Sequence, residues 1–296
     1  MPLAYDMPLY RPPSEGNNLI IQATIGCSFN HCTFCSMYKT KTYRARPLDE
    51  VFADIDAAAR VWPDASRVFL ADGDALTLPT DDLKRILDKL AETFPELTRV
   101  SAYATPINLN DKPAAELQAL KERKLNLVYL GIESGSADIL KRIVKGATPK
   151  TMQSALERAA EGGLKVSATV VLGLGGKHHW QDHIDGTAAV VNAAPPTYLS
   201  TLQLRLEYDV VKDYQERFAR GGDRFEWQDD EGVLAEQERL IAALDPPRPI
   251  IFRSNHASNC LALAGNLPRD RDRLLTMIAA ARAGAPVLRP AFLRGL

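Results

Sequence analysis

Residues 19–36 read LIIQATIGCSFNHCTFCS, an apolar run followed at once by a loop that contains three cysteines. The run Leu19–Thr24 is almost continuously apolar, which is typical of a strand buried on both faces of a parallel sheet. Such a strand delivers the loop after it to the carboxyl edge of the sheet, where α/β proteins bind their ligands. The three cysteines, Cys27, Cys32 and Cys35, lie within nine residues. This segment therefore predicts an α/β fold with a metal centre after its first strand.

Further apolar runs repeat along the chain and alternate with helix-like stretches. The strand-like runs are Arg67–Ala71, Arg99–Ala104, Leu125–Ile132, Lys165–Leu172 and Tyr198–Leu204, and the helix-like stretches are 48–60, 80–93, 113–122, 149–162 and 182–193. Six strands alternating with helices predict a parallel sheet, and the pattern alone leaves open whether that sheet is flat or curled into a barrel. After residue 205 we expect helices near 209–220, 231–244 and 268–283.

Composition narrows the class of protein. The 296 residues are 46% hydrophobic, enough for a substantial core in one barrel or two domains. Lys and Arg number 36 against 37 Asp and Glu, so we expect no dedicated nucleic-acid binder, which would carry a basic excess. Residues 1–17 lack the apolar run of a signal peptide, and no stretch reaches the ~18 apolar residues of a membrane span. We therefore expect a cytoplasmic protein without membrane partners.

The cysteine loop admits several metal chemistries. Three thiolates leave one iron of a four-iron cluster open to a small molecule. His31 could instead join the cysteines in a zinc site, although structural zinc usually draws on two separated ligand pairs. Cys32 and Cys35 alone form a CxxC redox spacing, which would not need Cys27. Cys260 could close an electron-transfer cluster or could be a buried thiol.

A strand, a cysteine loop and an aromatic residue before the last cysteine resemble the radical S-adenosylmethionine (radical SAM) superfamily. The spacing Cys27-x₄-Cys32-x₂-Cys35 is one residue longer than the family's usual CxxxCxxC. The resemblance covers about 18–205. It implies that these three cysteines hold a [4Fe-4S] cluster and that S-adenosylmethionine is the second cofactor.

The resemblance also implies a fold and a domain organisation. The expected fold is α/β, a partial (β/α)₆ TIM-like barrel with a helical C-terminal extension. Residues 1–17 would form a leader, 18–205 the barrel core and 206–296 an extension packed on the barrel. The active site would then lie at the C-terminal mouth of the barrel.

Two segments near the cysteines are assigned to the cofactor by this resemblance. Phe34 stands at the aromatic position that lies against the adenine in the family. Asp72-Gly73-Asp74 stands where the family has a Gly-Gly-Glu-like turn that meets the ammonium group of the cofactor. Gly73 would allow close backbone approach, and Asp74 would keep an acceptor in that turn.

Later landmarks complete the expected cofactor site. Glu133 and Ser134 end the fourth strand and would face the methionine or the ribose, and a buried Glu needs a polar partner. Lys145 stands where coproporphyrinogen dehydrogenases carry an Arg for the methionine carboxylate, and a solvated lysine is the alternative. The remaining assignments are Ser101 and Thr169 toward the ribose and Gly173 toward the adenine, with Tyr103 standing where some relatives have a Glu.

Two polar segments stay outside these assignments. His179 and His183 have the i, i+4 spacing of a metal pair, but no third ligand stands nearby, so we expect His178–His183 to form a solvated loop and helix start. The polar block 252–260 either lines the barrel mouth or caps neighbouring elements. Cys260, at its end, could donate a hydrogen atom to a product radical.

The function implied by the resemblance is reductive cleavage of S-adenosylmethionine to a 5′-deoxyadenosyl radical that abstracts hydrogen from a small molecule. An electron donor such as a flavodoxin or ferredoxin would supply the electron. We expect a single cluster, because no second cysteine set occurs, and no cobalamin-binding domain. An electron carrier closed by Cys260 and a zinc-stabilised binding protein remain alternatives.

Overall fold

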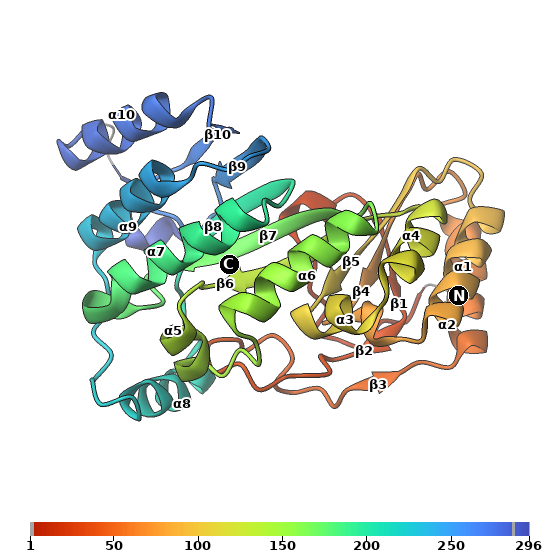
Figure 1. The fold of residues 1–296 in the computed structure, drawn as a ribbon. Helices are drawn as coiled ribbons and strands as arrows, with labels where there is room; N and C mark the ends of the chain where they lie inside the picture. Colours follow the sequence, from red (N-terminus) through yellow and green to blue (C-terminus); the bar gives the residue numbers. More distant parts are fainter. Residues whose placement is uncertain (1–2, 286–287, 296) are drawn as a thin grey trace. The chain divides into compact units, whose positions relative to one another are not determined.

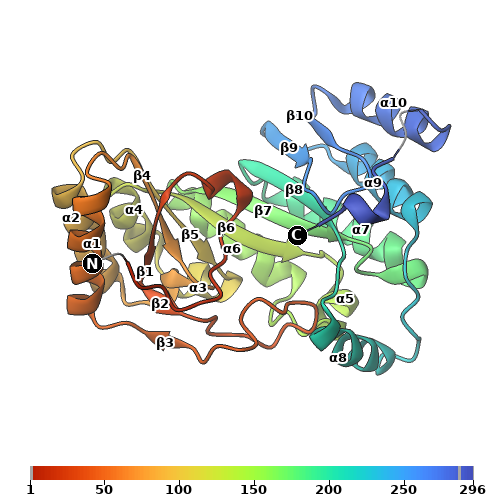
Figure 2. The same cartoon turned by 180° about the vertical axis from the view of Figure 1, so that it is seen from behind.

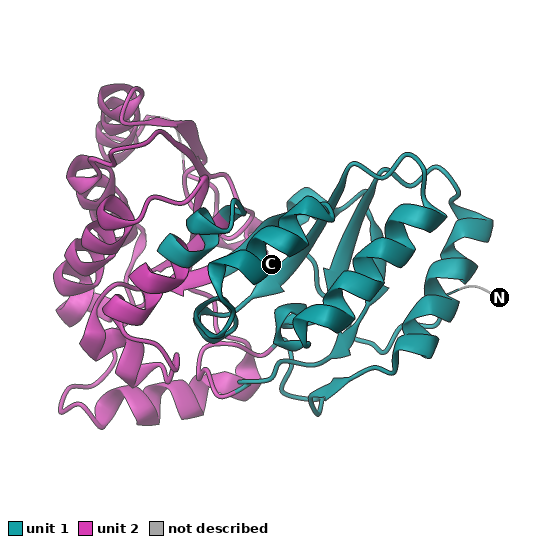
Figure 3. Ribbon diagram, turned by 45° about the vertical axis from the view of Figure 1, so that its right-hand side comes forward, with its two compact units in different colours: residues 1–30, 37–130, 157–166 teal, residues 31–36, 131–156, 167–296 magenta. Residues whose placement is uncertain are grey.

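The computed structural model describes residues 3–285 and 288–295 (Figure 1). The chain divides into two compact units, coloured separately in Figure 3. Unit 1 comprises residues 1–30, 37–130 and 157–166, and unit 2 comprises residues 31–36, 131–156 and 167–296. Among the described residues, no helix is both long enough and apolar enough to cross a membrane.

Eight strands form one sheet in the order β1-β4-β5-β6-β7-β8-β9-β10. The pairs β1–β4, β4–β5, β5–β6, β7–β8 and β8–β9 are parallel, and β9–β10 is antiparallel. Because β1 and β10 end this order, the strands form no closed barrel among the described residues. The predicted α/β class and parallel sheet are confirmed. The strands are β1 Leu19–Gln22, β4 Arg67–Ala71, β5 Arg99–Ala104, β6 Leu125–Glu133, β7 Lys165–Leu172, β8 Tyr198–Gln203, β9 Ile250–Ser254 and β10 Leu263–Leu267.

In unit 1, helices cover one face of the strands (Figures 1 and 3). α2 shows why: Leu83, Ile86, Leu87 and Leu90 recur at helical spacing and are all buried, and two aspartates occupy its first turn, where the helix dipole favours negative charge. Buried apolar residues at this spacing direct one helix face onto the sheet. The helices of this unit are α1 Leu48–Val61, α2 Thr80–Thr93, α3 Pro106–Asp111 and α4 Ala114–Glu122.

The leader of unit 1 crosses the opposite face of these strands (Figure 2). It contains the short 3-10 helix η1 Pro13–Glu15. The Glu15 side chain is fully buried, with Arg99 Nη2 2.9 Å away and the Tyr129 hydroxyl donating to it. A buried carboxylate needs such partners, so they fix the leader on the sheet. The short strands β2 Thr24–Ile25 and β3 Arg44–Ala45 pair antiparallel beside the cysteine loop.

Unit 2 contains the helices predicted for the tail and two strands that were not predicted. The predicted helices correspond to α8 Tyr208–Ala219, α9 Asp230–Ala243 and α10 Arg271–Arg282. β9 and β10 bury alternate residues only, so they lack the continuous apolar run that marked the earlier strands. The other helices are α5 Ala137–Arg142, α6 Pro149–Glu161, which belongs partly to unit 1, and α7 Gly176–Ala193.

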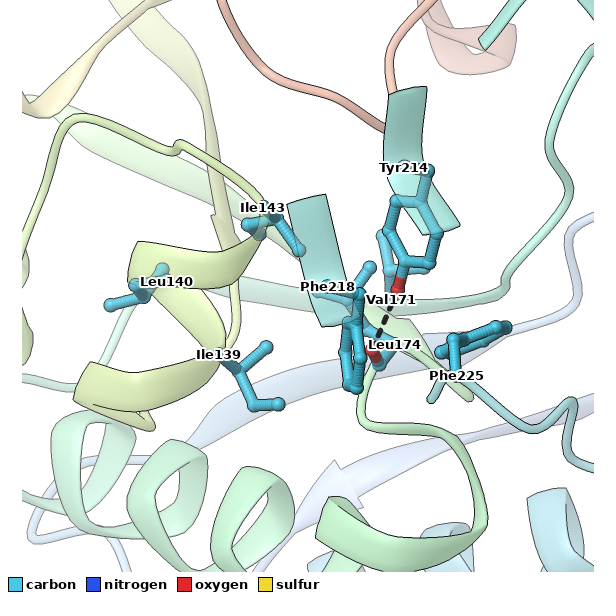
Figure 4. Close-up of a cluster of buried hydrophobic side chains, with 8 residues drawn as sticks. All are labelled: Ile139, Leu140, Ile143, Val171, Leu174, Tyr214, Phe218 and Phe225. Atoms are coloured by element: carbon cyan, nitrogen blue, oxygen red, sulfur yellow. Dashed lines mark hydrogen bonds between the residues drawn. The ribbon is translucent and has the colours of Figure 1, made fainter. Parts of the chain in front are cut away.

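A cluster of buried apolar side chains joins α5, the end of β7 and the region around α8 within unit 2 (Figure 4). The Tyr214, Phe218 and Phe225 rings pack edge-on or tilted, with centroids 4.9–5.9 Å apart, within the range in which aromatic pairs attract. Phe34 of the cysteine loop packs against this cluster. The first half of the extension therefore shares a core with the loop.

Candidate cofactor site

The turn after β4 is joined to the start of the cysteine loop by hydrogen bonds within unit 1. Asp72 is fully buried, with φ +47°, and its Oδ2 accepts from the Gly26 amide at 2.8 Å and from Lys41 Nζ at 2.9 Å. The Gly73 amide donates to the Gly26 carbonyl at 2.9 Å. A non-glycine residue in the left-handed region is strained and persists only where its surroundings hold it. These contacts fix the backbone that precedes Cys27.

Gly73 lies against Cys27 itself. A Cβ at position 73 would lie 2.5 Å from the Cys27 Cβ and 2.8 Å from its Cα, so only glycine fits without displacing the cysteine. The sequence assigned this glycine to close approach of the cofactor. The structure gives it a more immediate role, which is to make room for Cys27.

Asp74 supports the residue on the other side of Cys27. Its buried carboxylate accepts from the Ser28 amide at 3.0 Å, from the Ser28 hydroxyl, and from Thr77 Oγ1 at 2.8 Å. Three donors from the chain therefore occupy the acceptor that the sequence analysis assigned to the cofactor. The other carboxylate of the turn differs, because Asp72 Oδ1 is buried and has no hydrogen-bond partner among the described residues.

The remaining part of the cysteine loop is anchored within unit 2. Both the amide and the hydroxyl of Thr33 donate to the Ile143 carbonyl, at 3.0 and 3.3 Å. Ile143 is the C-cap residue of α5, and Val144 follows with φ +54°, an outlying conformation for a β-branched residue. This strained residue leads directly to Lys145. The end of α5 is therefore fastened to the loop between Cys32 and Cys35.

The Lys145 side chain is only 13% exposed and is paired, so the alternative of a solvated lysine is wrong. Its Nζ lies 3.1 Å from Glu133 Oε1 and 6.0 Å from the centre of the Phe34 ring. Burial acts to lower the pKa of Lys145, but the charges of Glu133, Cys32 and Cys35 outweigh burial and raise it. The lysine therefore stays an ammonium group beside these two cysteines.

Glu133 ends β6 in a strained conformation, with φ +62°. Its side chain folds back over Gly131, because a Cβ on Gly131 would lie 1.9 Å from Glu133 Oε1 and 2.9 Å from Lys145 Nζ. The glycine thus makes room for the ion pair. The expectation that a Glu at this position needs a polar partner is met by Lys145.

His183 corrects the expectation of a solvated histidine segment. It is fully buried in α7, with its ring nitrogens 2.8 Å from Ser134 Oγ and 3.0 Å from the Val171 carbonyl, and burial lowers its pKa to about 4. A neutral imidazole can donate from one nitrogen and accept at the other, so it bridges the ends of β6 and β7. Ser134 makes this contact, and its assignment to the cofactor stays a prediction.

The other histidines have separate partners. His178 Nε2 lies 3.1 Å from Glu226 and His179 Nε2 lies 3.2 Å from Asp223. Over residues 3–285 and 288–295, no group of three His, Cys, Asp or Glu side chains converges so that it could hold a single metal ion. The thiolates of an iron–sulfur cluster each bind a different iron, so their ligand set has wider spacing than that of a single ion.

Gly173 follows β7 with φ +82°, and a carboxylate from the C-terminal extension holds it. Its amide donates to Glu236 Oε2 at 2.6 Å, and the Gln228 side chain donates to Glu236 Oε1 at 3.0 Å. Burial raises the pKa of Glu236 to about 7. Sequence reasoning missed Glu236, because it lies on a helix far along the chain from Gly173.

The other predicted residues have mixed surroundings. Ser101 is buried and donates to the Val68 carbonyl at 3.4 Å, so its proton is used within the sheet. Tyr103 packs against Phe69 with ring centres 5.1 Å apart. Thr169 lies half-buried on β7. These side chains line strands, and their predicted contacts with the ribose stay predictions.

The polar block after β9 forms caps rather than an open polar surface. The Asn259 side chain accepts from the Gln203 amide at 2.7 Å and donates to the Thr201 carbonyl at 2.8 Å and to Ser254 Oγ at 2.9 Å. Cys260 next to it is buried, and burial raises its pKa to about 11. The structure therefore favours the capping interpretation and keeps Cys260 as a neutral thiol.

Known proteins resemble this chain over the part that contains these residues. Residues 21–188 match the family described as the Radical SAM superfamily. A putative methylthiotransferase of Methanocaldococcus jannaschii is 28% identical over 53% of this chain and 36% of its own length, and the heme chaperone HemW of Bacillus subtilis is 26% identical over 49% and 40%. The alignments thus span about two fifths or less of these relatives.

Solved structures agree on the fold. Coproporphyrinogen III oxidase (HemN) from Escherichia coli, a radical SAM enzyme, has a TM-score of 0.56 at 16% identity and matches over 76% of this chain and 51% of its own. The radical SAM methyltransferase TsrM from Kitasatospora setae, with cobalamin and a [4Fe-4S] cluster bound, has a TM-score of 0.51 at 17% identity, over 64% and 35%. Because the family match covers more than half of the residues of this chain, the chain belongs to the radical SAM superfamily.

Proposed function

We propose that the chain is an enzyme that cleaves S-adenosylmethionine reductively and uses the resulting radical on a small-molecule substrate. Membership of the family supports the proposal, and the observation that carries it is the cysteine loop, fixed at both of its ends. Gly73 makes room for Cys27, and Thr33 fastens the segment of Cys32 and Cys35 to α5. Such anchoring suits ligands of one metal group.

The residues present suit a [4Fe-4S] cluster and S-adenosylmethionine. Cys27, Cys32 and Cys35 supply three thiolates, which matches a four-iron cluster with one open iron. When bound and reduced, such a cluster would supply one electron for breaking a sulfonium–carbon bond of S-adenosylmethionine, which would give methionine and a 5′-deoxyadenosyl radical able to take a hydrogen atom from the substrate. The ammonium of Lys145 would offset part of the negative charge of the thiolates.

Glu133 and Lys145 are proposed to hold the amino-acid end of S-adenosylmethionine. A buried carboxylate and a largely buried ammonium 3.1 Å apart complement a ligand that carries both an ammonium and a carboxylate. Each partner of the pair would exchange one ion contact for another, so neither charge would stay unpaired in the interior. Asp72, whose Oδ1 is buried without a hydrogen-bond partner among the described residues, is a further acceptor near Cys27.

The other predicted residues are proposed to contact the rest of S-adenosylmethionine or to position those that do. Phe34 and Gly173 would lie against the adenine, and Ser101 and Thr169 would face the ribose. Gly73, Asp74 and Ser134 would act through the backbone that they position, because their contacts lie within the chain. We also propose the division into a leader (1–17), a core (18–205) and an extension (206–296), and an electron donor such as a flavodoxin or ferredoxin.

The test is cofactor cleavage by the purified protein. The protein is reconstituted with iron and sulfide without oxygen, reduced with dithionite and given S-adenosylmethionine, and 5′-deoxyadenosine is measured by chromatography. We expect product from the wild type and none from Cys35→Ala. Cys260→Ala is the matched control, and it should keep both the cluster and the product.

Two results would overturn the proposal. Loss of the cluster in Cys260→Ala would indicate an electron carrier with four cysteine ligands. Stoichiometric zinc in the purified protein, with no iron or sulfide bound after reconstitution, would indicate a zinc-stabilised binding protein. A reducible cluster that neither binds nor cleaves S-adenosylmethionine would also end the proposal.

A further inference from the structure

The turn between β7 and α7 depends on the C-terminal extension for its shape. It runs from Leu172 to Gly176, with φ +82° at Gly173 and +58° at Gly176. One hydrogen bond closes it internally, from the Gly176 amide to the Gly173 carbonyl at 3.0 Å. Two residues with positive φ and one internal bond give a glycine-rich turn little rigidity of its own. Other parts of unit 2 must therefore hold it.

Three hydrogen bonds from the extension hold the backbone of this turn and of the start of α7. Glu236 of α9 accepts from the Gly173 amide at 2.6 Å. The Tyr214 hydroxyl of α8 donates to the Leu174 carbonyl at 2.7 Å, drawn as the dashed line in Figure 4. The Glu226 carbonyl accepts from the Lys177 amide at 3.0 Å. The extension therefore binds both donors and acceptors of one short backbone segment.

Among the residues that make these contacts, Glu236 is the one whose burial is unfavourable in free energy. Its side chain is fully buried, and no Lys or Arg within the described ranges offsets its charge. Transfer of a carboxylate into the interior without a cation is unfavourable, and only the Gly173 amide and the Gln228 side chain compensate for it. At pH values above its pKa of about 7, Glu236 is ionised, and its hydrogen bond from the Gly173 backbone N–H is then a strong, charge-assisted one. A neutral glutamine would fill the same space at lower cost.

We propose that Glu236 is a positioning residue for cofactor binding: it fixes the Gly173 backbone in the shape that S-adenosylmethionine requires. The inference rests on the proposed function, because Gly173 is proposed to meet the adenine. It adds a role for the extension, whose α9 supplies a part of the site that lies outside the region matched by the family. Tyr214 also helps to hold the turn, because its hydroxyl donates to the carbonyl of Leu174, the residue after Gly173.

The experiment compares Glu236→Gln with Glu238→Gln, a surface carboxylate on the same helix that pairs with Arg282. Binding of S-adenosylmethionine to the reconstituted, unreduced proteins is measured by calorimetry. Hydrogen exchange of the peptide over 171–177 is measured on the same samples. A glutamine keeps an oxygen for the Gly173 amide and an amide group toward Gln228, so the variant removes the charge of the acceptor and keeps its size. We expect about tenfold weaker binding and faster exchange in Glu236→Gln, as for loss of one charge-assisted hydrogen bond, and no change in Glu238→Gln.

The outcomes separate this inference from the proposed function. Equal binding by the wild type and Glu236→Gln would overturn the inference and leave the proposed function intact. Absence of binding by the wild type would overturn the proposed function and the inference with it. If Glu236→Gln does not fold, Tyr214→Phe tests the same turn, and unchanged binding and exchange in that variant would count against the inference.

Discussion

The residues that flank Cys27 donate to two buried carboxylates, whereas Cys32 and Cys35 interact with a largely buried ammonium group, that of Lys145. On the Cys27 side, Asp74 accepts from three donors of the chain and a glycine fits against the cysteine. On the other side, the ion pair joins Glu133, which has a strained backbone, to Lys145, which follows the strained Val144. The side around Cys27, Asp72 and Asp74 is held in place by the chain, and we call it the fixed side. The side around Glu133 and Lys145 holds charges that a ligand can contact, and we call it the adjustable side. The four predictions below test this difference.

The largest effect is expected for Gly73→Ala. The new methyl group would meet the Cys27 Cβ at 2.5 Å and its Cα at 2.8 Å, so a backbone has to move. Overpacking of this kind costs about 3 kcal/mol or more where nothing can yield, and the atom displaced is part of a proposed ligand. We expect loss of most of the bound iron after reconstitution, measured by iron and sulfide analysis.

Gly131→Ala is the matched control for that prediction. Its methyl group would meet Glu133 Oε1 at 1.9 Å, at the end of a flexible side chain that can turn away. We expect this variant to keep its iron and to bind S-adenosylmethionine more weakly. If both variants lost iron equally, the contrast between a fixed side and an adjustable side would be wrong.

The sequence predicted the six strands of the core because fully buried parallel strands are continuous apolar runs. It predicted the cysteine loop because three thiols in nine residues have few other uses. It missed Glu236 and the role of His183, since both depend on partners that only folding brings close: Gly173 for the first, Ser134 and Val171 for the second. His183 also stands in a polar stretch that favours a solvated interpretation.

The second prediction concerns how the stability of the fold depends on pH through His183, whose ring contacts Ser134. Burial lowers the pKa of His183 to about 4 in the folded chain, against a reference value of 6.5. Between these values the unfolded chain binds a proton that the folded chain does not. The contribution of His183 is therefore fully present above pH 6.5 and is lost as pH falls toward 4, with a total of about 3 kcal/mol.

Urea unfolding from pH 7.5 to 4 measures this dependence. His183→Gln removes the titrating group, so we expect its stability to fall less steeply than that of the wild type over this range. Carboxylates titrate in both proteins and cancel in the comparison. Parallel curves would show that His183 is not the group responsible and would weaken its role in holding the adjustable side.

The third prediction tests the ion pair directly. Lys145→Gln removes the ammonium group beside Glu133. We expect it to weaken binding of S-adenosylmethionine tenfold or more, and a tenfold change is about 1.4 kcal/mol in the free energy of binding. Lys141→Gln, at an exposed position of α5, is the control and should bind normally. Because Lys145 and Glu133 are in contact, their effects should be less than additive in the double variant with Glu133→Gln. Additive effects would mean that the two residues act separately.

The smallest effect is expected for Thr33→Val, which removes the hydroxyl bond to the Ile143 carbonyl at 3.3 Å and keeps the backbone bond at 3.0 Å. The side chain is buried and its volume is nearly kept, so the loss is one neutral hydrogen bond, about 1 kcal/mol. Urea unfolding measures this loss, and iron content should not change.

Thr77→Val, which removes one of the three donors to Asp74, is the counterpart on the fixed side. If the adjustable side depends on its few anchors, Thr33→Val should weaken cofactor binding slightly and Thr77→Val should not. The reverse result would mean that the Cys27 side is the one that adjusts to the ligand.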